Sequence, residues 1–461
     1  MDPDMKQLLT SIETETGKST ILSGADITDR YAVDWSRENP CRPEVVLRPT
    51  STHEVSTILR LCNEARQPLV VQGGMTGLVG GATPRSGEWV LSLERLNGVL
   101  ELDANSMTLT AKAGTPLETL QIAAREAGYM LPLDLGARGS CTIGGNIATN
   151  AGGNQVIQYG MIRSLVLGLD VVMADGTLIS SKNKLLKNNT GFDLKHLFIG
   201  SEGSLGVVTE AILRLFPAMS SRQTALCAMP EFSDVIALLK SMKQKLSVIS
   251  SFEAMWASYY RYAVDQVKRI PDPFAQHHNY YVLLESEGND PDKDETRFQQ
   301  ALFEEIENGT VADAVLSRSA QDRQKFWAVR DAVGEILREV KHEANFDIGI
   351  PLNETEGCIR EIETELNNTF KDLFLLIFGH VGDGNLHLIA STGKPEDTRR
   401  IYDIVYRITG NHHGGIAAEH GIGILKKPWL HLSRSPAEIA LMRTLKTAFD
   451  PNNILNPGRV I

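Results

Sequence analysis

Two histidines lie on either side of a glycine-rich turn in the segment FGHVGDGNLH. A turn followed by a strand can bring His387 back towards His380, so that both imidazoles can bind one metal ion. Farther along the chain, AAEHGIG adds Glu419 and His420. Two imidazoles and one carboxylate are a common ligand set for a divalent cation that keeps open coordination positions. These residues predict a metal site; the alternative is hydrogen-bonded core or surface histidines.

Three glycine-rich segments come before these histidines in the chain. They are GGMTGLVGG at 73–81, LDLGARGSCTIGGNIATNAGG at 133–153 and GSEGSLG at 200–206. Glycine lets the backbone approach a ligand closely, and consecutive backbone N–H groups can surround a phosphate. The first segment lacks the Lys-Ser/Thr ending of a P-loop. We therefore predict one long polar ligand with phosphate groups, with tight crossovers in a β-rich domain as the alternative.

The composition is that of a globular protein. The 461 residues suffice for two or three domains, and the net charge of −11 disfavours nucleic acid and anionic membranes as main partners. No apolar run is long enough to span a bilayer, and the acidic N-terminus does not resemble a signal peptide. The five cysteines include no CxxC pair, which is typical of reduced thiols. We expect a cytoplasmic protein without a transmembrane segment.

The first half is predicted to alternate short strands with helices. A capping box at Ser51 and Glu54 begins one helix, and Thr115 is predicted to cap another, with Pro116 at its first position and Gly128 beyond its end. An Asp-Gly turn predicts a hairpin in LDVVMADGTLI. The other predicted elements are a helix at 6–13, strands in VVLRP, PLVV, VLSL and VVTEAILRL, and a hairpin of 99–102 with 107–112.

From about residue 217 the sequence has longer helical patterns, fewer glycines and more charge. Strand-like runs at 224–228, 280–284 and 311–316 alternate with helical patterns at 234–245, 292–306 and 320–340. The polar junction 288–291 is predicted to be a loop. We therefore expect an α+β domain whose sheet is covered by helices on one side.

The glycine-rich segments resemble a known family. VVQGGMTGLVGG, LDLGARGSCTIGGNIATNAGGN and FIGSEGSLGVVTEAILRLF are similar to the FAD-binding domain of the vanillyl-alcohol-oxidase (PCMH) type, nearest to the branch of D-lactate, D-2-hydroxyglutarate and glycolate dehydrogenases. The resemblance covers roughly residues 42–459. It implies an α+β protein with an FAD-binding domain at 1–217 (1–40 being a lead-in), a substrate domain with an antiparallel sheet at 218–415, and a return to the first domain at 416–461.

The resemblance also implies which residues contact FAD. Residues 73–78 would bind the pyrophosphate, residues 133–150 would follow the pyrophosphate and isoalloxazine, and residues 203–207 would hold the adenosine side. Relatives with covalent flavin often attach it through a histidine in the first segment, which has none here, so non-covalent FAD is expected. The predicted cofactor-binding residues are Gly73, Gly74, Met75, Thr76, Gly77, Leu78, Pro132, Leu133, Asp134, Gly139, Ser140, Thr142, Gly144, Gly145, Asn146, Thr149, Asn150, Gly152, Gly203, Gly206, Val207 and Asn456.

Two further motifs resemble the metal-bearing segments of this family. FGHVGDGNLH and AAEHGIG would make His380, His387 and Glu419 the ligands of a divalent metal, zinc or alternatively manganese, and His420 the catalytic base. The segment WAVR resembles the family's substrate segment and implies that Arg330 binds the substrate carboxylate. The planar guanidinium suits this role because it binds a carboxylate through two hydrogen bonds.

The expected substrate rests on three departures from the family pattern. Relatives that look specific for D-2-hydroxyglutarate offer a hydroxyl, a lysine and an asparagine where this chain has Gly334, Asn345 and Ile389. Burying a distal carboxylate without a cation is costly, although Lys341 or Arg138 could replace the lysine. We therefore expect D-lactate or another short or apolar D-2-hydroxy acid, with D-2-hydroxyglutarate or glycolate as the alternative.

The expected reaction is oxidation to the 2-keto acid by hydride transfer to the flavin N5, with His420 accepting the hydroxyl proton beside the metal. Two other classes remain open from sequence: a metal-dependent hydrolase, and a flavin-binding, non-catalytic subunit. The electron acceptor, whether a quinone, an electron-transfer flavoprotein or a cytochrome, cannot be named from sequence. Assembly into a homodimer and peripheral attachment to a membrane also remain open.

Overall fold

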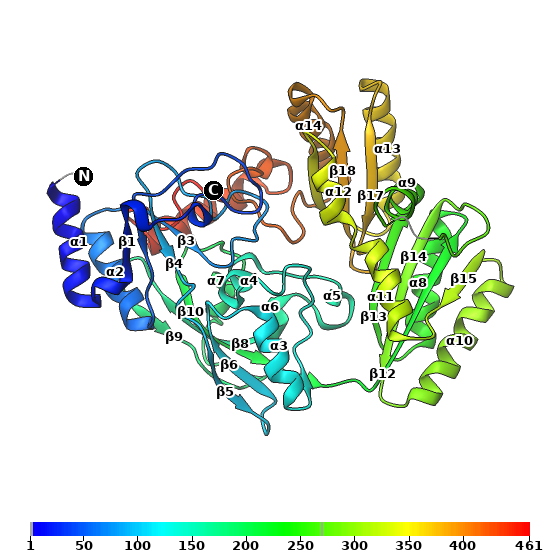
Figure 1. Cartoon of the computed structure of the whole chain (residues 1–461), viewed down its shortest axis with the longest axis horizontal. Helices are drawn as coiled ribbons and strands as arrows, with labels where there is room; N and C mark the ends of the chain where they lie inside the picture. Colours follow the sequence, from blue (N-terminus) through cyan, green and yellow to red (C-terminus); the bar gives the residue numbers. More distant parts are fainter. Residues whose placement is uncertain (1–2, 269–270) are drawn as a thin grey trace. The chain divides into compact units, whose positions relative to one another are not determined.

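A computed structural model describes residues 3–268 and 271–461 (Figure 1). The chain forms two compact units. The first unit contains the chain up to Gly153, Gly160–Ala218 and Glu419–Ile461, and the second contains Asn154–Tyr159 and Met219–Ala418. The short segment 154–159 thus leaves the first unit and joins the second, and the return to the first unit begins at Glu419.

The first unit contains two main sheets. In the first sheet, of order β1-β2-β4-β3, the strands β2, β4 and β3 are parallel; the second sheet, of order β5-β6-β10-β8-β9, is antiparallel. The strands are β1 (Ile21–Ser23), β2 (Val45–Leu47), β3 (Leu69–Gln72), β4 (Trp89–Ser92), β5 (Val99–Asp103), β6 (Thr108–Lys112), β8 (Val166–Val172), β9 (Leu178–Ser180), β10 (Val207–Arg214), and the small pair β7 (Tyr129–Met130) and β11 (Phe216–Pro217). The predicted strands and hairpins of this half are therefore present.

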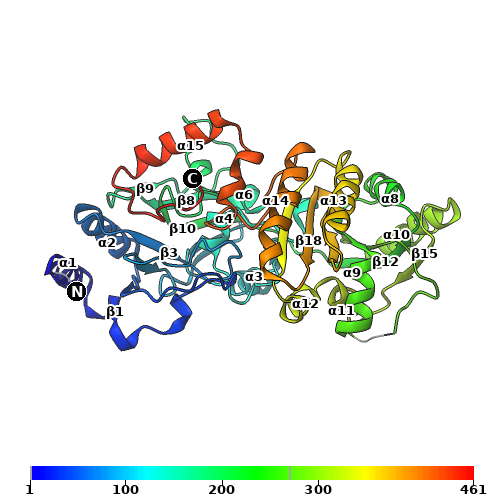
Figure 2. The ribbon, with the colours of Figure 1, turned by 90° about the horizontal axis from the view of Figure 1, so that it is seen from above.

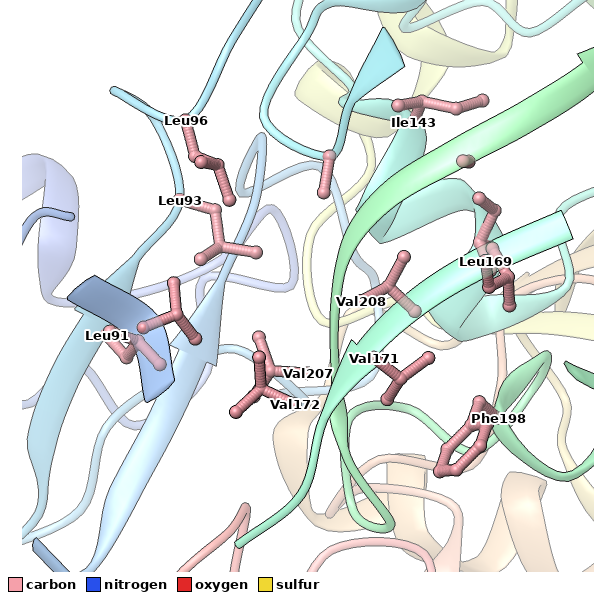
Figure 3. Close-up of a cluster of buried hydrophobic side chains, with 14 of the residues drawn as sticks. Leu91, Leu93, Leu96, Ile143, Leu169, Val171, Val172, Phe198, Val207 and Val208 are labelled. Atoms are coloured by element: carbon pink, nitrogen blue, oxygen red, sulfur yellow. The ribbon is translucent and has the colours of Figure 1, made fainter. Parts of the chain in front are cut away.

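A single apolar core joins these two sheets. Leu91 of β4 and Leu93 just beyond it belong to the same buried cluster as Val172 of β8 and Val207 of β10. Figure 3 shows these side chains close together, with Val171 and, below it, Phe198 on the other side of the second sheet. All of these side chains are buried, so burial of apolar surface holds the sheets together.

The helices of the first unit differ from the predictions in their boundaries. The first helix is longer than predicted. Ser51 accepts the N–H of Glu54 as predicted, but the Glu54 carboxylate accepts the N–H of Thr50, one residue earlier than a capping box requires. The N-cap of the next helix is Pro116 and not Thr115. The Thr115 hydroxyl instead accepts the N–H of Gly98 and donates to the carbonyl of Lys112. The helices are α1 (Pro3–Thr16), α2 (Thr52–Glu64), α3 (Leu117–Glu126), α4 (Ile143–Thr149), α6 (Ile162–Leu165), α7 (Lys195–Phe198) and α15 (Pro436–Phe449).

The second unit is built on one antiparallel seven-stranded sheet of order β15-β12-β14-β13-β17-β18-β16. Three of its strands were not predicted, β13, β16 and β17, whereas β18 is the strand expected after the turn that follows His380. The predicted loop 288–291 is shorter than expected, since β14 ends at Gly288 and the next helix begins at Pro291. The strands are β12 (Ser221–Met229), β13 (Ile249–Trp256), β14 (Tyr280–Gly288), β15 (Asp313–Leu316), β16 (Ala344–Gly349), β17 (Phe374–Gly379) and β18 (Asn385–Ser391).

Helices cover both faces of this sheet, so the prediction of one covered side was wrong. Phe232 of α8 packs against Trp256 of β13, whereas Met255, which points to the opposite face, lies in a cluster with Tyr259 of α9 and Ile336 of α12. In Figures 1 and 2, α13 and α14 lie side by side. The helices are α5 (Val156–Tyr159), α8 (Phe232–Lys245), α9 (Ala257–Arg261), α10 (Pro291–Glu307), α11 (Ala320–Arg330), α12 (Val333–Glu339), α13 (Thr355–Thr369) and α14 (Pro395–Asn411), with a π-helical turn at Tyr262–Lys268.

The predicted helix 320–340 is interrupted. It ends at Arg330 and resumes as α12 at Val333. At the break, the Tyr259 hydroxyl donates a hydrogen bond of 2.5 Å to the carbonyl oxygen of Arg330. Within the described residues, none of the helices combines the length and the apolar character needed to cross a membrane. All five cysteines are free thiols.

The side chain of His412, which follows α14, hydrogen-bonds to Glu361 of α13 and to Glu354 just before it. This contact makes the stability of the fold depend on pH. The two ring nitrogens lie 3.0 Å from Glu361 and 3.0 Å from Glu354, and these hydrogen bonds raise the pKa of His412. A raised pKa means that the stabilisation is complete below the unfolded value of about 6.5 and is lost as pH rises through the folded value. We expect His412→Gln to cost about 0.5–1 kcal/mol near pH 6 and little near pH 9. Thermal unfolding at both pH values checks this, and an equal loss at both would contradict it.

Candidate active site

The three glycine-rich segments meet within the first unit. A Cβ on Gly74 would overlap the carbonyl oxygen of Ser140, so the first segment lies directly against the second. The side chain of Asn456 connects strand β3, which leads into the first segment, to the third segment. Its Oδ1 accepts the N–H of Val71 over 2.8 Å, and its Nδ2 donates to the carbonyl of Glu202 over 2.6 Å. The predicted cofactor-binding segments therefore form one continuous region although they are far apart in sequence.

Polar atoms without a partner lie buried in this region. Among the described residues, Thr142 Oγ1 and Asn146 Oδ1 are enclosed and make no hydrogen bond. Leaving such groups unpaired costs free energy, so an unpaired group calls for an explanation such as a bound ligand. Met75 adopts a left-handed backbone conformation, with φ of 60°, which is uncommon outside glycine and clusters at functional sites, whereas Asn150, with φ of 51°, is the left-handed C-cap of the helix Ile143–Thr149.

The glycines serve two different purposes. A Cβ on Gly206 would lie 2.7 Å from Val171, and one on Gly144 would lie 2.7 Å from the Ala113 side chain, so these two allow the chain itself to pack closely. Gly145 is less crowded, since the nearest atom to its Cβ position is 3.4 Å away. The sequence interpretation attributed the glycines of these segments to ligand contact, whereas close packing accounts for part of them.

The loop that carries Glu419 and His420 is attached to the third glycine-rich segment. The Glu202 carboxylate accepts the N–H groups of Ile422 at 2.7 Å and Gly423 at 2.9 Å. Burial raises the pKa of Glu202, and these two hydrogen bonds act against the increase. The Glu419 carboxylate also accepts the N–H of Gly153 at the end of the second segment. The first unit thus holds this loop beside its predicted cofactor region.

In the second unit, a tight turn brings the two histidines together. Strand β17 leads through a 3₁₀ turn at Val381–Asp383 into β18, which runs back along β17. His387 is thereby the register partner of Phe378, and the ring centroids of His380 and His387 lie 5.4 Å apart. Both histidines are buried. The structure therefore brings together the two imidazoles that the sequence proposed as metal ligands.

A buried carboxylate connects His380 to Arg330. Glu253 of β13 accepts the Nε–H of Arg330 over 2.8 Å, and its other oxygen lies 2.6 Å from His380 Nδ1. Arg330 Nη2 lies 3.2 Å from His380 Nε2, and its guanidinium stands over the ring of Phe378 at 5.2 Å. Burial alone would raise the pKa of Glu253, but attraction to His380 and Arg330 lowers it to about 2. Burial works against the charge of Arg330, yet Glu253 raises its pKa above the usual range.

A second carboxylate lies on the strand next to His387. Asp347 of β16 is the register partner of His387, and its Oδ1 accepts a hydrogen bond from Asn385 over 2.9 Å. Its Oδ2 accepts the N–H of Ala418 over 3.2 Å. Ala418 is the last residue of the second unit and is directly followed in the chain by Glu419.

The predicted substrate residues lie on neighbouring elements of the second unit. Asn345 and Ile389 are register partners two positions from Asp347 and His387, and therefore lie on the same face of the sheet. The Ile389 side chain is fully buried in the cluster that includes Tyr259 and Phe378. Gly334 lies in α12, and a Cβ there would meet no atom within 4 Å.

Sequence reasoning missed three acidic residues of this region: Glu253, Asp347 and Glu202. The first two lie within strands that were not predicted, and their only signal was a charged residue inside an apolar run, as in SSFEAMW. Glu202 lies inside a predicted segment but has the side chain of an ordinary surface residue. Its role depends on contacts with residues more than 200 positions later in the chain.

The fold is shared with solved structures of two other proteins. The chain matches p-cresol methylhydroxylase with substrate bound at a TM-score of 0.79 and 15% identity, over 100% of this chain and 97% of the other. It matches alkyldihydroxyacetonephosphate synthase at a TM-score of 0.76 and 17% identity, over 99% and 86%. At such low identities these matches establish the fold alone, and they confirm the predicted FAD-binding fold of the PCMH type.

Sequence comparison is more specific. Residues 43–182 match the FAD binding domain, and residues 218–460 match the C-terminal domain of FAD linked oxidases. The chain is 38% identical to D-2-hydroxyglutarate dehydrogenase of Xanthomonas citri pv. viticola, over 94% of this chain and 92% of the relative. It is 35% identical to the enzyme of that name from Stutzerimonas stutzeri, over 98% of each chain, and 35% identical to the mitochondrial one from Arabidopsis thaliana, over 96% and 80%.

These matches span nearly the whole chain, including both glycine-rich and histidine-bearing parts. They confirm the resemblance seen in the sequence, the use of FAD and the assignment of the chain as an oxidoreductase. They also remove the basis of the hydrolase interpretation, which treated the glycine-rich segments as purely structural. The chain belongs to the FAD linked oxidases and, within them, to the FAD-dependent D-2-hydroxyacid dehydrogenase family.

Proposed function

We propose that this protein oxidises a D-2-hydroxy acid to the 2-keto acid with FAD as electron acceptor, and that D-2-hydroxyglutarate is its first candidate substrate. The observation that carries the proposal is the buried group of Arg330, Glu253 and His380 beside His387. It combines a planar cation suited to a carboxylate with two imidazoles suited to a metal. A non-catalytic flavin subunit would have no need of such a group.

The choice of acid rests on the relatives, which bear the name D-2-hydroxyglutarate dehydrogenase and cover nearly the whole chain. They support the alternative substrate of the sequence analysis better than its first expectation, D-lactate or another short acid. The departures at Gly334, Asn345 and Ile389 remain, so a distal carboxylate would need a cation from another position. D-lactate is therefore kept as the second candidate.

The residues present fit both cofactors. Thr142 Oγ1 and Asn146 Oδ1 are buried without a partner and would accept or donate hydrogen bonds to bound FAD. His380 and His387 are buried imidazoles with adjacent rings, which suits a divalent cation such as zinc or manganese. We propose Glu419 as the third ligand. The chain allows this because Ala418 is tied to Asp347, the register partner of His387, and the Cα of the next residue is about 3.8 Å farther on.

The proposed mechanism assigns one task to each side chain. Arg330 binds the substrate carboxylate, while His380, His387 and Glu419 hold the cation near the substrate hydroxyl. His420 accepts the hydroxyl proton at a ring nitrogen. When bound, FAD supplies the two-electron acceptor and the cation supplies Lewis acidity towards the hydroxyl. A separate electron acceptor, such as a quinone, an electron-transfer flavoprotein or a cytochrome, would complete turnover.

A comparison of kcat/KM tests the substrate assignment. With a dye as electron acceptor, the panel is D-2-hydroxyglutarate, D-malate, D-lactate and D-2-hydroxybutyrate. The proposal expects D-2-hydroxyglutarate to give the highest value. A clear preference for D-lactate or D-2-hydroxybutyrate would instead support the second candidate, and would indicate that Gly334, Asn345 and Ile389 determine the specificity.

The attachment of FAD gives a prediction of its own. Since the segment 73–81 contains no histidine, we expect FAD to be held by hydrogen bonds and packing alone. Acid precipitation should then release all of the yellow colour into the supernatant. Flavin absorption that remains with the washed protein pellet would contradict this.

A further inference from the structure

We propose that Glu253 is a positioning residue that orients His380 for the metal and Arg330 for the substrate at the same time. The inference rests on the proposed function of His380 as a metal ligand and of Arg330 as the carboxylate clamp. Glu253 itself is assigned neither as a metal ligand nor as a base. It lies in the middle of the seven-stranded sheet, on β13, and its side chain is 1% exposed.

Glu253 determines which ring nitrogen of the His380 imidazole carries the proton. His380 Nδ1 lies 2.6 Å from a Glu253 oxygen, and a carboxylate can only accept a hydrogen bond, so Nδ1 carries the proton. Nε2 then keeps its lone pair, which is the form of histidine that binds a metal. A carboxylate behind a ligating histidine also fixes the orientation of the ring and increases its basicity.

Glu253 also orients the guanidinium of Arg330. The other Glu253 oxygen accepts the Nε–H of Arg330 over 2.8 Å, and the same side chain lies over the Phe378 ring. These contacts fix the plane of the guanidinium. With Nε occupied, the edge that a substrate carboxylate would use is formed by the two Nη groups, of which Nη1 lies 3.7 Å from the Asp331 carboxylate. Arg330 Nη2 now lies 3.2 Å from His380 Nε2, so the guanidinium and a cation would compete for the same lone pair.

A purely structural ion pair does not account for this arrangement. Pairing of Glu253 with Arg330 alone would satisfy both charges, whereas Glu253 divides its two oxygens between Arg330 and His380. Burying three ionisable groups is costly unless each is paired and hydrogen-bonded. A chain selected only for stability would be better served by apolar side chains of similar volume, so the arrangement is best explained by what it presents to ligands.

The test uses the purified flavoprotein with its metal removed and FAD retained. It is titrated with Zn²⁺ in competition with a chelating dye, for the wild type, Glu253→Gln and Arg330→Gln. Because loss of a carboxylate behind a ligating histidine typically costs 10–100-fold in metal affinity, we expect a loss of about that size in Glu253→Gln. Arg330→Gln is the matched control: it breaks the same ion pair but keeps Glu253 on His380, and should retain or increase Zn²⁺ affinity.

The variants also keep the test decisive if one of them fails to fold. Glu253→Gln leaves the buried Arg330 with only the longer, half-exposed contact to Asp331 at 3.7 Å, which is destabilising. The double variant Glu253→Gln/Arg330→Gln removes both charges, and its comparison with Arg330→Gln isolates Glu253. The inference would be overturned if Glu253→Gln bound Zn²⁺ within about twofold of the wild type, or if the double variant bound it within about twofold of Arg330→Gln. Either result would leave the proposed function intact. A wild type that binds no equivalent of Zn²⁺ or Mn²⁺ would overturn the inference together with the proposed metal site.

Discussion

Replacing Arg330 with lysine is expected to lower kcat/KM for the 2-hydroxy acid by about 100-fold or more. Lysine keeps the charge but loses the planar pair of donors, and each hydrogen bond between charged groups contributes about 1.5–3 kcal/mol. Lysine also cannot reproduce the geometry of the Arg330–Glu253 contact. Steady-state kinetics with a dye acceptor measures the effect. The flavin spectrum should change little, because the predicted cofactor residues lie in the first unit.

Arg338→Lys provides the matched control. This arginine lies on α12 in the same unit and is exposed, so the same substitution there should leave kcat/KM within about twofold, as is usual for surface positions. A loss in Arg330→Lys no larger than that in Arg338→Lys would show that Arg330 does not bind the substrate carboxylate.

Removal of the metal is the second large effect that we expect. Chelation, or His387→Ala, should lower turnover by about 1,000-fold or more, since the proposed cation contributes several kcal/mol of charge stabilisation in the transition state. Bound FAD should remain and keep its spectrum. Turnover is measured before and after dialysis against a chelator, and again after Zn²⁺ or Mn²⁺ is added back.

The control for His387 is His277→Ala, at an exposed position in the same unit. This variant should retain activity and its response to chelation. If the fully demetallated wild type turned over at its normal rate, the assignment of His380, His387 and Glu419 to a metal would be wrong, whereas the assignment of FAD would stand.

Local signals in the sequence predicted the parts of the site that depend on neighbouring residues. The turn between His380 and His387 is encoded by glycines within one short segment, and the structure has the two rings adjacent. Most strands of the first unit were also predicted, because apolar or alternating runs are bounded there by turn residues, whereas the short strands β1, β7 and β11 were not. The N-cap at Thr115 was misplaced by one residue, because its hydroxyl is taken by backbone groups of the preceding hairpin.

The parts that escaped prediction depend on contacts between distant segments. Glu253 and His380 are 127 positions apart, and Asn456 and Val71 are 385 apart. No local pattern reports such pairs. The strands β13, β16 and β17 were also missed, although the equally buried β12 and β14 of the same sheet were predicted.

Anaerobic reduction of the bound flavin tests the central claim most directly. The purified protein is mixed without oxygen with the D and L enantiomers of 2-hydroxyglutarate and of lactate, and the flavin absorption is followed. We predict that a D-2-hydroxy acid, with D-2-hydroxyglutarate fastest, bleaches the flavin completely, that the L enantiomers do not, and that Arg330→Lys slows the bleaching. Flavin that dithionite reduces but that no D-2-hydroxy acid bleaches would contradict the account.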